Sequence, residues 1–245
     1  YYFADDTRGT RRFKKLGIAQ IQHVVYDNQY KQTSISNWSD IEKTRNLIFA
    51  GTVFQTKGTR RFIWDEFLRN FSDDKSSFYI PLRKNGIIKP NNYRVKHLHK
   101  KLMEDSELSD LHNDVIQHPC FKGSLFPNEL KHVLPRYKYG MVFRCISIHD
   151  SLNFRPVLYV TNGVLPLFDY RYDPEYLQVP KHIQDQLVVR CASDINSKIQ
   201  YFNANDHART ALLDELRVFF EINEYEENPG GMIRREIKKM IPEFA

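Results

Sequence analysis

The chain has 245 residues, of which 41% are hydrophobic and 13% aromatic, and its formal net charge is +6. This composition supplies enough apolar side chains for a core and argues against a disordered chain. No stretch approaches the roughly 20 consecutive apolar residues of a membrane span, and the three cysteines have no disulfide-like spacing. We therefore expect an intracellular protein, nuclear if it is eukaryotic, with an anionic partner and no membrane partner.

Residues 1–31 are expected to form a strand pair or an irregular lead-in, and helical elements follow them. A capping box at residues 39–42 predicts a helix over residues 39–49. Residues 60–71 are expected to form a second helix, because apolar residues recur there at helical spacing and suit a core. That apolar stripe consists of Phe62, Ile63, Phe67, Leu68 and Phe71. Residues 78–82 include a proline and are expected to form a strand at the margin of a sheet.

The next segment combines a hairpin with two helices. An Asn-Gly turn signal predicts a hairpin over residues 82–88. Helices are expected over residues 93–103 and 106–117, the second from the spacing of its apolar side chains. A hairpin beside a helix pair is compatible with a winged-helix-like element.

Past residue 139 the pattern changes to strands. Residues 139–148 partly alternate apolar and polar side chains. Residues 157–168 are expected to form a hairpin around Asn162-Gly163, a dipeptide typical of tight hairpin turns. A second strand pair is expected over residues 187–192 and 198–202.

The chain is predicted to end in two helices, over residues 207–223 and 232–240. We therefore predict an α+β protein, with a mostly helical N-terminal half and a C-terminal antiparallel sheet followed by two helices. Residues 1–118 form a basic helical and hairpin region in this interpretation. Residues 139–245 hold the sheet and the last helices, and residues 119–138 connect the two regions.

A basic phrase occurs twice. Residues 7–13 (TRGTRRF) return as residues 56–62 (TKGTRRF), 49 positions later and with six of seven residues identical. Glycine permits a turn whose backbone N–H groups point outward, and paired arginines can grip a phosphate. The phrase lacks the Gly-Lys-Ser/Thr ending of a Walker loop. Three interpretations stay open: a turn that contacts phosphate or nucleic acid, a basic turn anchored in the core by its phenylalanine, or a turn that binds an acidic protein partner.

A second basic stretch, residues 83–101, holds seven Lys or Arg and two His residues without an acid. Such a stretch suits contact with a nucleic-acid backbone, although a solvated helix face has the same composition. We predict that nine residues contact nucleic acid, six in the two copies of the basic phrase and three in residues 83–101. They are Arg8, Arg11, Arg12, Lys57, Arg60, Arg61, Arg94, Lys96 and Lys100.

No pattern identifies catalysis. The histidines between residues 97 and 118 lack the paired spacing of a zinc site, and no nucleophile motif is present. We therefore predict no catalytic residue, no metal ligand and no cofactor. Asp110 and Asp114 share one helix face and could hold Mg²⁺, which keeps a nuclease open.

We predict a non-enzymatic nucleic-acid-binding subunit, on DNA rather than RNA, of a transcription, replication or chromatin assembly. Other protein subunits are its further expected partners. One alternative is a metal-dependent nuclease or other phosphoryl-handling enzyme that uses Asp110 and Asp114. Another is a non-catalytic scaffold subunit, whose acidic residues 214–227 and basic residues 232–240 bind other chains.

Overall fold

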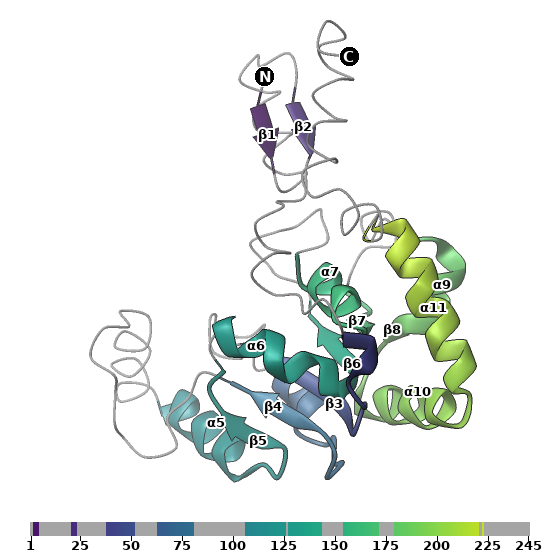
Figure 1. Cartoon of the computed structure of the whole chain (residues 1–245). Helices are drawn as coiled ribbons and strands as arrows, with labels where there is room; N and C mark the ends of the chain where they lie inside the picture. The colour runs from purple at the N-terminus through teal and green to yellow at the C-terminus, as the bar shows by residue number, and fades with distance from the viewer. Residues whose placement is uncertain are drawn as a thin grey trace, which may run out of the picture.

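The centre of the molecule is a six-stranded sheet in which all strands are parallel (Figure 1). The computed structural model describes residues 2–4, 21–23, 38–51, 63–80, 106–125, 127–143, 154–171, 179–220 and 222. The strands of the sheet are β3 (Arg45–Ala50), β4 (Ser77–Tyr79), β5 (Phe121–Gly123), β6 (Tyr137–Val142), β7 (Leu165–Asp169) and β8 (Val188–Val189). A separate parallel pair consists of β1 (Tyr2–Ala4) and β2 (Ile21–His23).

The strand order in the sheet is β5-β4-β3-β6-β7-β8. The chain enters at the centre with β3 and adds β4 and β5 on one side. It then returns to the centre with β6 and adds β7 and β8 on the other side. The carboxyl ends of β3 and β6 therefore flank the point at which the order reverses. Residues 119–138 were predicted to connect two regions. They contain strand β5, so this segment contributes to the sheet.

The predicted antiparallel sheet and α+β class are wrong. The described strands belong to an α/β, Rossmann-like arrangement in which helical segments connect parallel neighbours. The helical elements are η1 (Trp38–Asp40), η2 (Ile63–Leu68, a π-helical turn), α5 (Ser106–Gln117), α6 (Pro127–Val133), η3 (Leu134–Arg136), α7 (Phe154–Thr161), α9 (Lys181–Leu187), α10 (Ala192–Ala204) and α11 (Asp206–Phe219).

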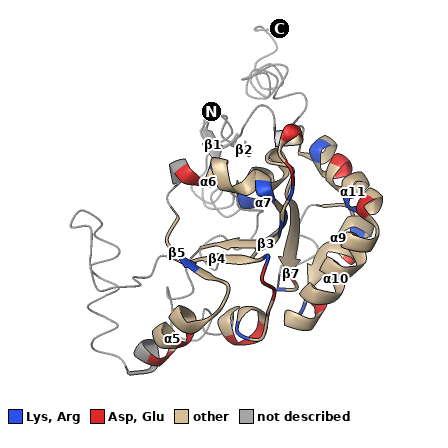
Figure 2. Ribbon diagram, turned by 60° about the horizontal axis from the view of Figure 1, so that its bottom comes forward, with Lys and Arg blue, Asp and Glu red and all other residues tan. Residues whose placement is uncertain are grey.

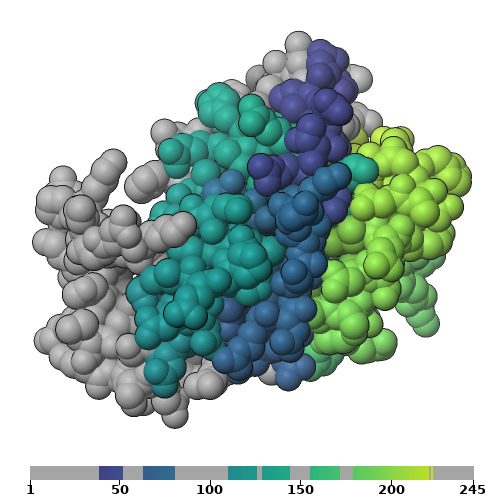
Figure 3. All heavy atoms as spheres, turned by 90° about the horizontal axis from the view of Figure 1, so that it is seen from below, coloured from purple at the N-terminus to yellow at the C-terminus, as the bar shows by residue number. Residues whose placement is uncertain are grey.

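The helices cover the sheet in the way that right-handed connections predict. The chain leaves the centre of the sheet first in one direction and later in the other. Helix α7 packs on β6 and β7 and also contacts α11, whereas α10 contacts η2 and β8. Figure 3 shows the α10 and α11 region in yellow-green directly beside the segment that contains η2 and β4, in blue. Elements far apart in the chain thus share one core.

The helix predicted over residues 39–49 is wrong, because residues 45–49 belong to the central strand β3. Leu47, Ile48 and Phe49 are at most 4% exposed. A strand at the middle of a parallel sheet is covered on both faces, so its side chains form a continuous apolar run instead of an alternating one. Such a short run has no period that separates a strand from a buried helix.

The hairpin predicted over residues 157–168 is also wrong. Its first half is helix α7 and its second half is β7. Gly163 has φ of 69°, the left-handed conformation that commonly ends a helix. The Asn-Gly dipeptide therefore ends α7 and does not join two antiparallel strands.

The outcome of most of the remaining predictions depends on whether the apolar residues of the segment recur at helical spacing. Helix α5 confirms the helix over residues 106–117, and α11 confirms the one expected from residue 207. The strand over residues 198–202 is wrong, because Ile195, Ile199 and Phe202 follow the helical period of α10. Strand β4 lies between β3 and β5 and is not at the margin of the sheet.

The apolar stripe after the second basic phrase is confirmed as core where it is described: Ile63, Phe67, Leu68 and Phe71 are buried. Three predicted elements lie outside the described residues: the hairpin over residues 82–88, the helix over 93–103 and the helix over 232–240. The winged-helix-like element depends on the first two. Within the described part of the chain, no helix has the length and apolar character needed to cross a membrane.

Helix α7 lies close to β6 because residue 140 is glycine. A Cβ atom placed on Gly140 would lie 2.4 Å from Cε2 of Tyr159, which is far inside van der Waals contact. Tyr159 is 1% exposed, so its ring has no free space to move into. The missing side chain of Gly140 is therefore the space that the Tyr159 ring occupies.

Lys43 joins the entry of β3 to two neighbouring segments. Its Nζ donates hydrogen bonds to the carbonyl oxygens of Pro135 (3.0 Å), Tyr137 (3.2 Å) and Asn162 (3.5 Å). Burial lowers the pKa of Lys43 to about 7, and the nearby Arg209 guanidinium acts in the same direction. The side chain thus binds its proton less tightly in the folded state than in the unfolded chain.

We expect Gly140→Ala to lower the free energy of unfolding by about 3 kcal/mol, because the new methyl group overlaps the buried ring of Tyr159. Chemical denaturation monitored by circular dichroism measures this change. Ser197→Ala, on the exposed side of α10, is the control and should change stability by less than about 0.5 kcal/mol. An equally small effect of Gly140→Ala would contradict the close packing of α7 on β6.

We expect Lys43 to make stability rise with pH. Between the folded pKa of about 7 and an unfolded pKa of about 10.4, the unfolded chain holds a proton that the folded protein has lost. The free energy of unfolding therefore increases with pH across this window. Denaturation at several pH values should show a steeper rise for the wild type than for Lys43→Met. Parallel pH profiles would disprove the lowered pKa.

Candidate functional site

The strand order points to the carboxyl edge of the sheet between β3 and β6. In open parallel sheets, ligands bind outside the carboxyl ends of the strands where the strand order reverses. Gly51 directly follows β3, and its N–H donates to the carbonyl oxygen of Tyr79 (3.0 Å). A Cβ atom on Gly51 would lie 3.0 Å from the Phe49 ring and 3.5 Å from Nη1 of Arg155. The tight contact is with the Phe49 ring, and the Arg155 guanidinium lies beside Gly51 at the end of β3.

Tyr159 links the two central strands at this edge of the sheet. Its hydroxyl donates to the carbonyl oxygen of Met141 in β6 (3.3 Å), and it also hydrogen-bonds the Arg155 side chain and the backbone of Ala50 in β3. Burial raises the pKa of the Tyr159 phenol, against the opposing effect of Arg155. The hydroxyl thus stays protonated, joins the two central strands and positions Arg155.

An aromatic series runs along the same edge. The ring centroid of Phe143, which follows β6, lies 5.2 Å from that of Phe49 and 5.3 Å from that of Phe67. Phe67 in turn lies 6.4 Å from Tyr170, which directly follows β7. Tyr170 is 43% exposed, so the series ends in a ring that a planar ligand can contact.

The turn after β7 is fixed by a buried ion pair. Asp169 accepts hydrogen bonds from the backbone N–H of Arg171 (2.8 Å) and from Nε (2.9 Å) and Nη2 (2.7 Å) of its side chain. The Asp169 side chain has no exposed surface. These charge-assisted bonds satisfy the carboxylate and hold the backbone at Tyr170 in place.

The nine predicted nucleic-acid-binding residues, Arg8, Arg11, Arg12, Lys57, Arg60, Arg61, Arg94, Lys96 and Lys100, lie outside the described residues. Their role stays a prediction. In the view of Figure 2, the Lys and Arg residues that are described are spread over several elements. The structure therefore adds other residues to the candidate site and leaves the nine predicted ones untested.

One residue of the acidic pair proposed for Mg²⁺, Asp114, is engaged elsewhere. Asp114 accepts a hydrogen bond and an ion pair from Arg69. Among the residues described, no group of three His, Cys, Asp or Glu side chains could hold a metal ion. The described part of the chain thus offers no support for a metal-dependent nuclease.

The sequence contained signals for the residues that were missed. Arg155 and Tyr159 belong to a segment that was predicted to be a hairpin. Pro156 falls in the first turn of α7, where proline is tolerated, and Asn162-Gly163 follows at the end. Proline near the start and glycine past the end are typical of a helix. Gly51, directly after an apolar run, was the matching signal for a turn out of a strand.

The fold resembles that of two solved structures. The DNA modifying enzyme β-glucosyltransferase, solved with and without its substrate uridine diphosphoglucose, matches with a TM-score of 0.54 and 13% identity over 91% of this chain and 62% of that chain. T4 phage BGT in complex with its UDP-glucose substrate matches with a TM-score of 0.54 and 11% identity over 95% of this chain and 60% of that chain. No protein-family model and no curated protein sequence matches the chain.

At these identities the likeness shows the fold alone, and this chain spans about three fifths of each neighbour's length. The neighbours are nevertheless DNA-modifying enzymes that use a sugar nucleotide. This finding overturns the predicted non-enzymatic subunit of a transcription, replication or chromatin assembly. A nuclear location and other protein subunits likewise gain no support. The error has a physical reason. Basic segments indicate that a protein binds an anionic partner, but they do not indicate whether it then catalyses a reaction on that partner.

We expect Tyr159→Phe to lower the free energy of unfolding by about 1 to 2 kcal/mol, because the hydroxyl between β3 and β6 is lost and its buried partners remain. Urea denaturation measures the change. Tyr201→Phe is the matched control, since Tyr201 is 54% exposed, and it should have almost no effect. Equal effects of the two substitutions would contradict the role of Tyr159 in joining the strands.

Proposed function

We propose that the chain is a glycosyltransferase that binds a uridine diphosphate sugar at the carboxyl edge between β3 and β6 and acts on nucleic acid. The observation that carries this proposal is the parallel strand order, which reverses between β3 and β6. The sugar nucleotide and the DNA acceptor come from the two structural neighbours. Because the chain is shorter than these enzymes, the proposal concerns first of all nucleotide binding.

The diphosphate of the ligand would lie against Arg155. Its guanidinium reaches the end of β3 beside Gly51, and arginine binds phosphate oxygens with paired, charge-assisted hydrogen bonds. In the sequence, Lys57, Arg60 and Arg61 lie 7 to 11 positions after the end of β3. We assign these three side chains to the same diphosphate. The exposed ring of Tyr170 would contact the planar uracil base.

The transfer reaction needs stabilisation of the leaving group. An acceptor hydroxyl forms a bond to the anomeric carbon of the sugar, the bond from that carbon to the phosphate oxygen breaks, and uridine diphosphate leaves with the electron pair. The hydroxyl proton passes to a base or to water. Cations around the diphosphate stabilise the charge that develops on it, which is the role of Arg155 in this proposal.

The acceptor would be held by the other basic residues predicted from the sequence. Arg8, Arg11, Arg12, Arg94, Lys96 and Lys100 are assigned to backbone phosphates of nucleic acid. Backbone contacts orient an acceptor without selecting its sequence. Acceptor binding should therefore weaken steeply as the salt concentration rises.

We expect isothermal titration calorimetry to detect UDP-glucose binding by the wild type, with an affinity about 10-fold lower for Arg155→Gln because one charge-assisted contact to the diphosphate is lost. Transfer of labelled glucose should then be measured on DNA duplexes with and without a hydroxyl group on a base.

The matched control is Arg190→Gln, which removes an exposed arginine beyond β8 and should leave UDP-glucose affinity unchanged. A folded wild-type protein without affinity for UDP-glucose would refute the proposed function. Equal affinities of the wild type and Arg155→Gln would instead remove Arg155 from the site.

A further inference from the structure

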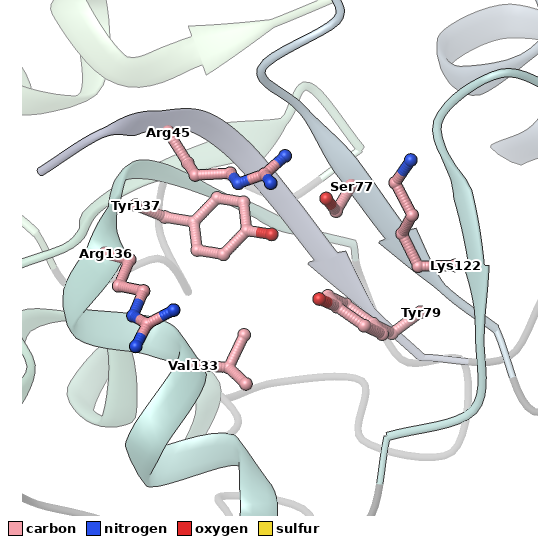
Figure 4. Close-up of a pocket in the computed structure, with 7 residues that line it drawn as sticks. All are labelled: Arg45, Ser77, Tyr79, Lys122, Val133, Arg136 and Tyr137. Carbon is pink, nitrogen blue, oxygen red and sulfur yellow. The ribbon is translucent and has the colours of Figure 1, made fainter.

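A polar pocket lies among β3, β4, β5 and β6 and the segment that leads into β6 (Figure 4). It has a volume of about 270 Å³. Its lining combines three basic side chains, three hydroxyl-bearing ones and one aliphatic one, and contains no carboxylate. These residues are Arg45, Ser77, Tyr79, Lys122, Val133, Arg136 and Tyr137.

The pocket shares no lining side chain with the site described above, although Tyr79 in its wall lies next to that site. Arg45 and Tyr137 are the first residues of β3 and β6, whereas Tyr79 is the last residue of β4 and pairs with Ala50. The switch-point site lies at the carboxyl ends of β3 and β6. Val133 at the end of α6 and Arg136 in η3 contribute to the wall from the crossover that leads into β6.

Hydroxyl groups converge within the pocket. Tyr137 and Ser77 are at most 2% exposed, and the Tyr137 hydroxyl hydrogen-bonds those of Ser77 and Tyr79. Figure 4 shows the three oxygens directed toward the same space. Burial raises the pKa of Tyr137, so its hydroxyl remains a proton donor near neutral pH.

Three permanent cations surround these hydroxyls from three different elements. Arg45 lies on β3, Lys122 on β5 and Arg136 on η3. None of the three forms an ion pair with a carboxylate among the residues described. Lys122 donates one hydrogen bond, to the carbonyl oxygen of Pro119 (3.4 Å). Basic side chains that line one pocket together favour the binding of an anion.

We propose that this pocket binds the phosphate group of a small phosphorylated molecule. A phosphate offers the several acceptor oxygens that two guanidinium groups, an ammonium group and converging hydroxyls can satisfy together. The volume is close to the lower end of the range for small-molecule sites, about 300 to 1,000 Å³. A concave pocket of this size admits a terminal phosphate and a small carrier more readily than the continuous backbone of a duplex.

The test uses calorimetric titration of the whole chain with inorganic phosphate, ribose 5-phosphate and a DNA duplex that lacks terminal phosphates. Each titration is repeated with saturating UDP-glucose, which occupies the switch-point site if the proposed function is right. We expect the wild type to bind ribose 5-phosphate with the same Kd in both conditions. The double variant Arg45→Gln/Arg136→Gln should raise that Kd at least about 10-fold.

Arg190→Gln is again the charge-matched control and should keep the wild-type Kd. If the double variant does not fold, Tyr79→Phe replaces it, and its smaller change should raise the Kd about 3-fold or more. The proposal is overturned if the folded wild type binds neither small phosphate, if the pocket variants keep the wild-type Kd, or if only the duplex binds. The last result would identify a backbone-binding surface instead.

This inference is independent of the proposed function. Failure to bind UDP-glucose would refute the glycosyltransferase and leave the pocket titrations unaffected. Loss of ribose 5-phosphate binding on addition of UDP-glucose would show that the small phosphate occupies the switch-point site, which would overturn the second pocket.

Discussion

The close contact between Gly140 and Tyr159 is the constraint on which the centre of the molecule depends. Any side chain at residue 140 would overlap the Tyr159 ring, so helix α7 can lie this close to β6 only with glycine there. The ring in turn brings the Tyr159 hydroxyl to Met141 and Ala50. The position of Arg155 at the switch point thus follows from one absent side chain in the sheet.

Helices with a full apolar period could be predicted from the sequence, whereas the sheet could not. Helices α5 and α11 carry apolar side chains at helical spacing along their whole length, which makes their type readable locally. Strand β3 is a short apolar run, and such a run is equally compatible with a buried helix. Whether strands are parallel depends on what connects them, and Asn162-Gly163 suits both a hairpin turn and the end of a helix.

The candidate site was harder to predict than the fold because its parts come together only through topology. Gly51 lies more than a hundred positions before Arg155 and Tyr170 in the sequence. They share an edge only because parallel strands all end on the same side of the sheet. A cluster of basic residues can be recognised within a short stretch of sequence, which is why the basic phrases were predicted to bind the partner. The single arginine of α7 has no charged neighbour in sequence to mark it.

The two edge strands of the sheet also affect how readily the molecule associates with other copies of itself. Strand β5 has three residues with Lys122 at its centre, and β8 has two. A long, uncharged margin presents a row of unpaired backbone groups to which a foreign strand can add, whereas short margins and lysine discourage such addition. The sheet is therefore poorly suited to growth by strand exchange or edge-to-edge aggregation, even though its central strands are strongly apolar.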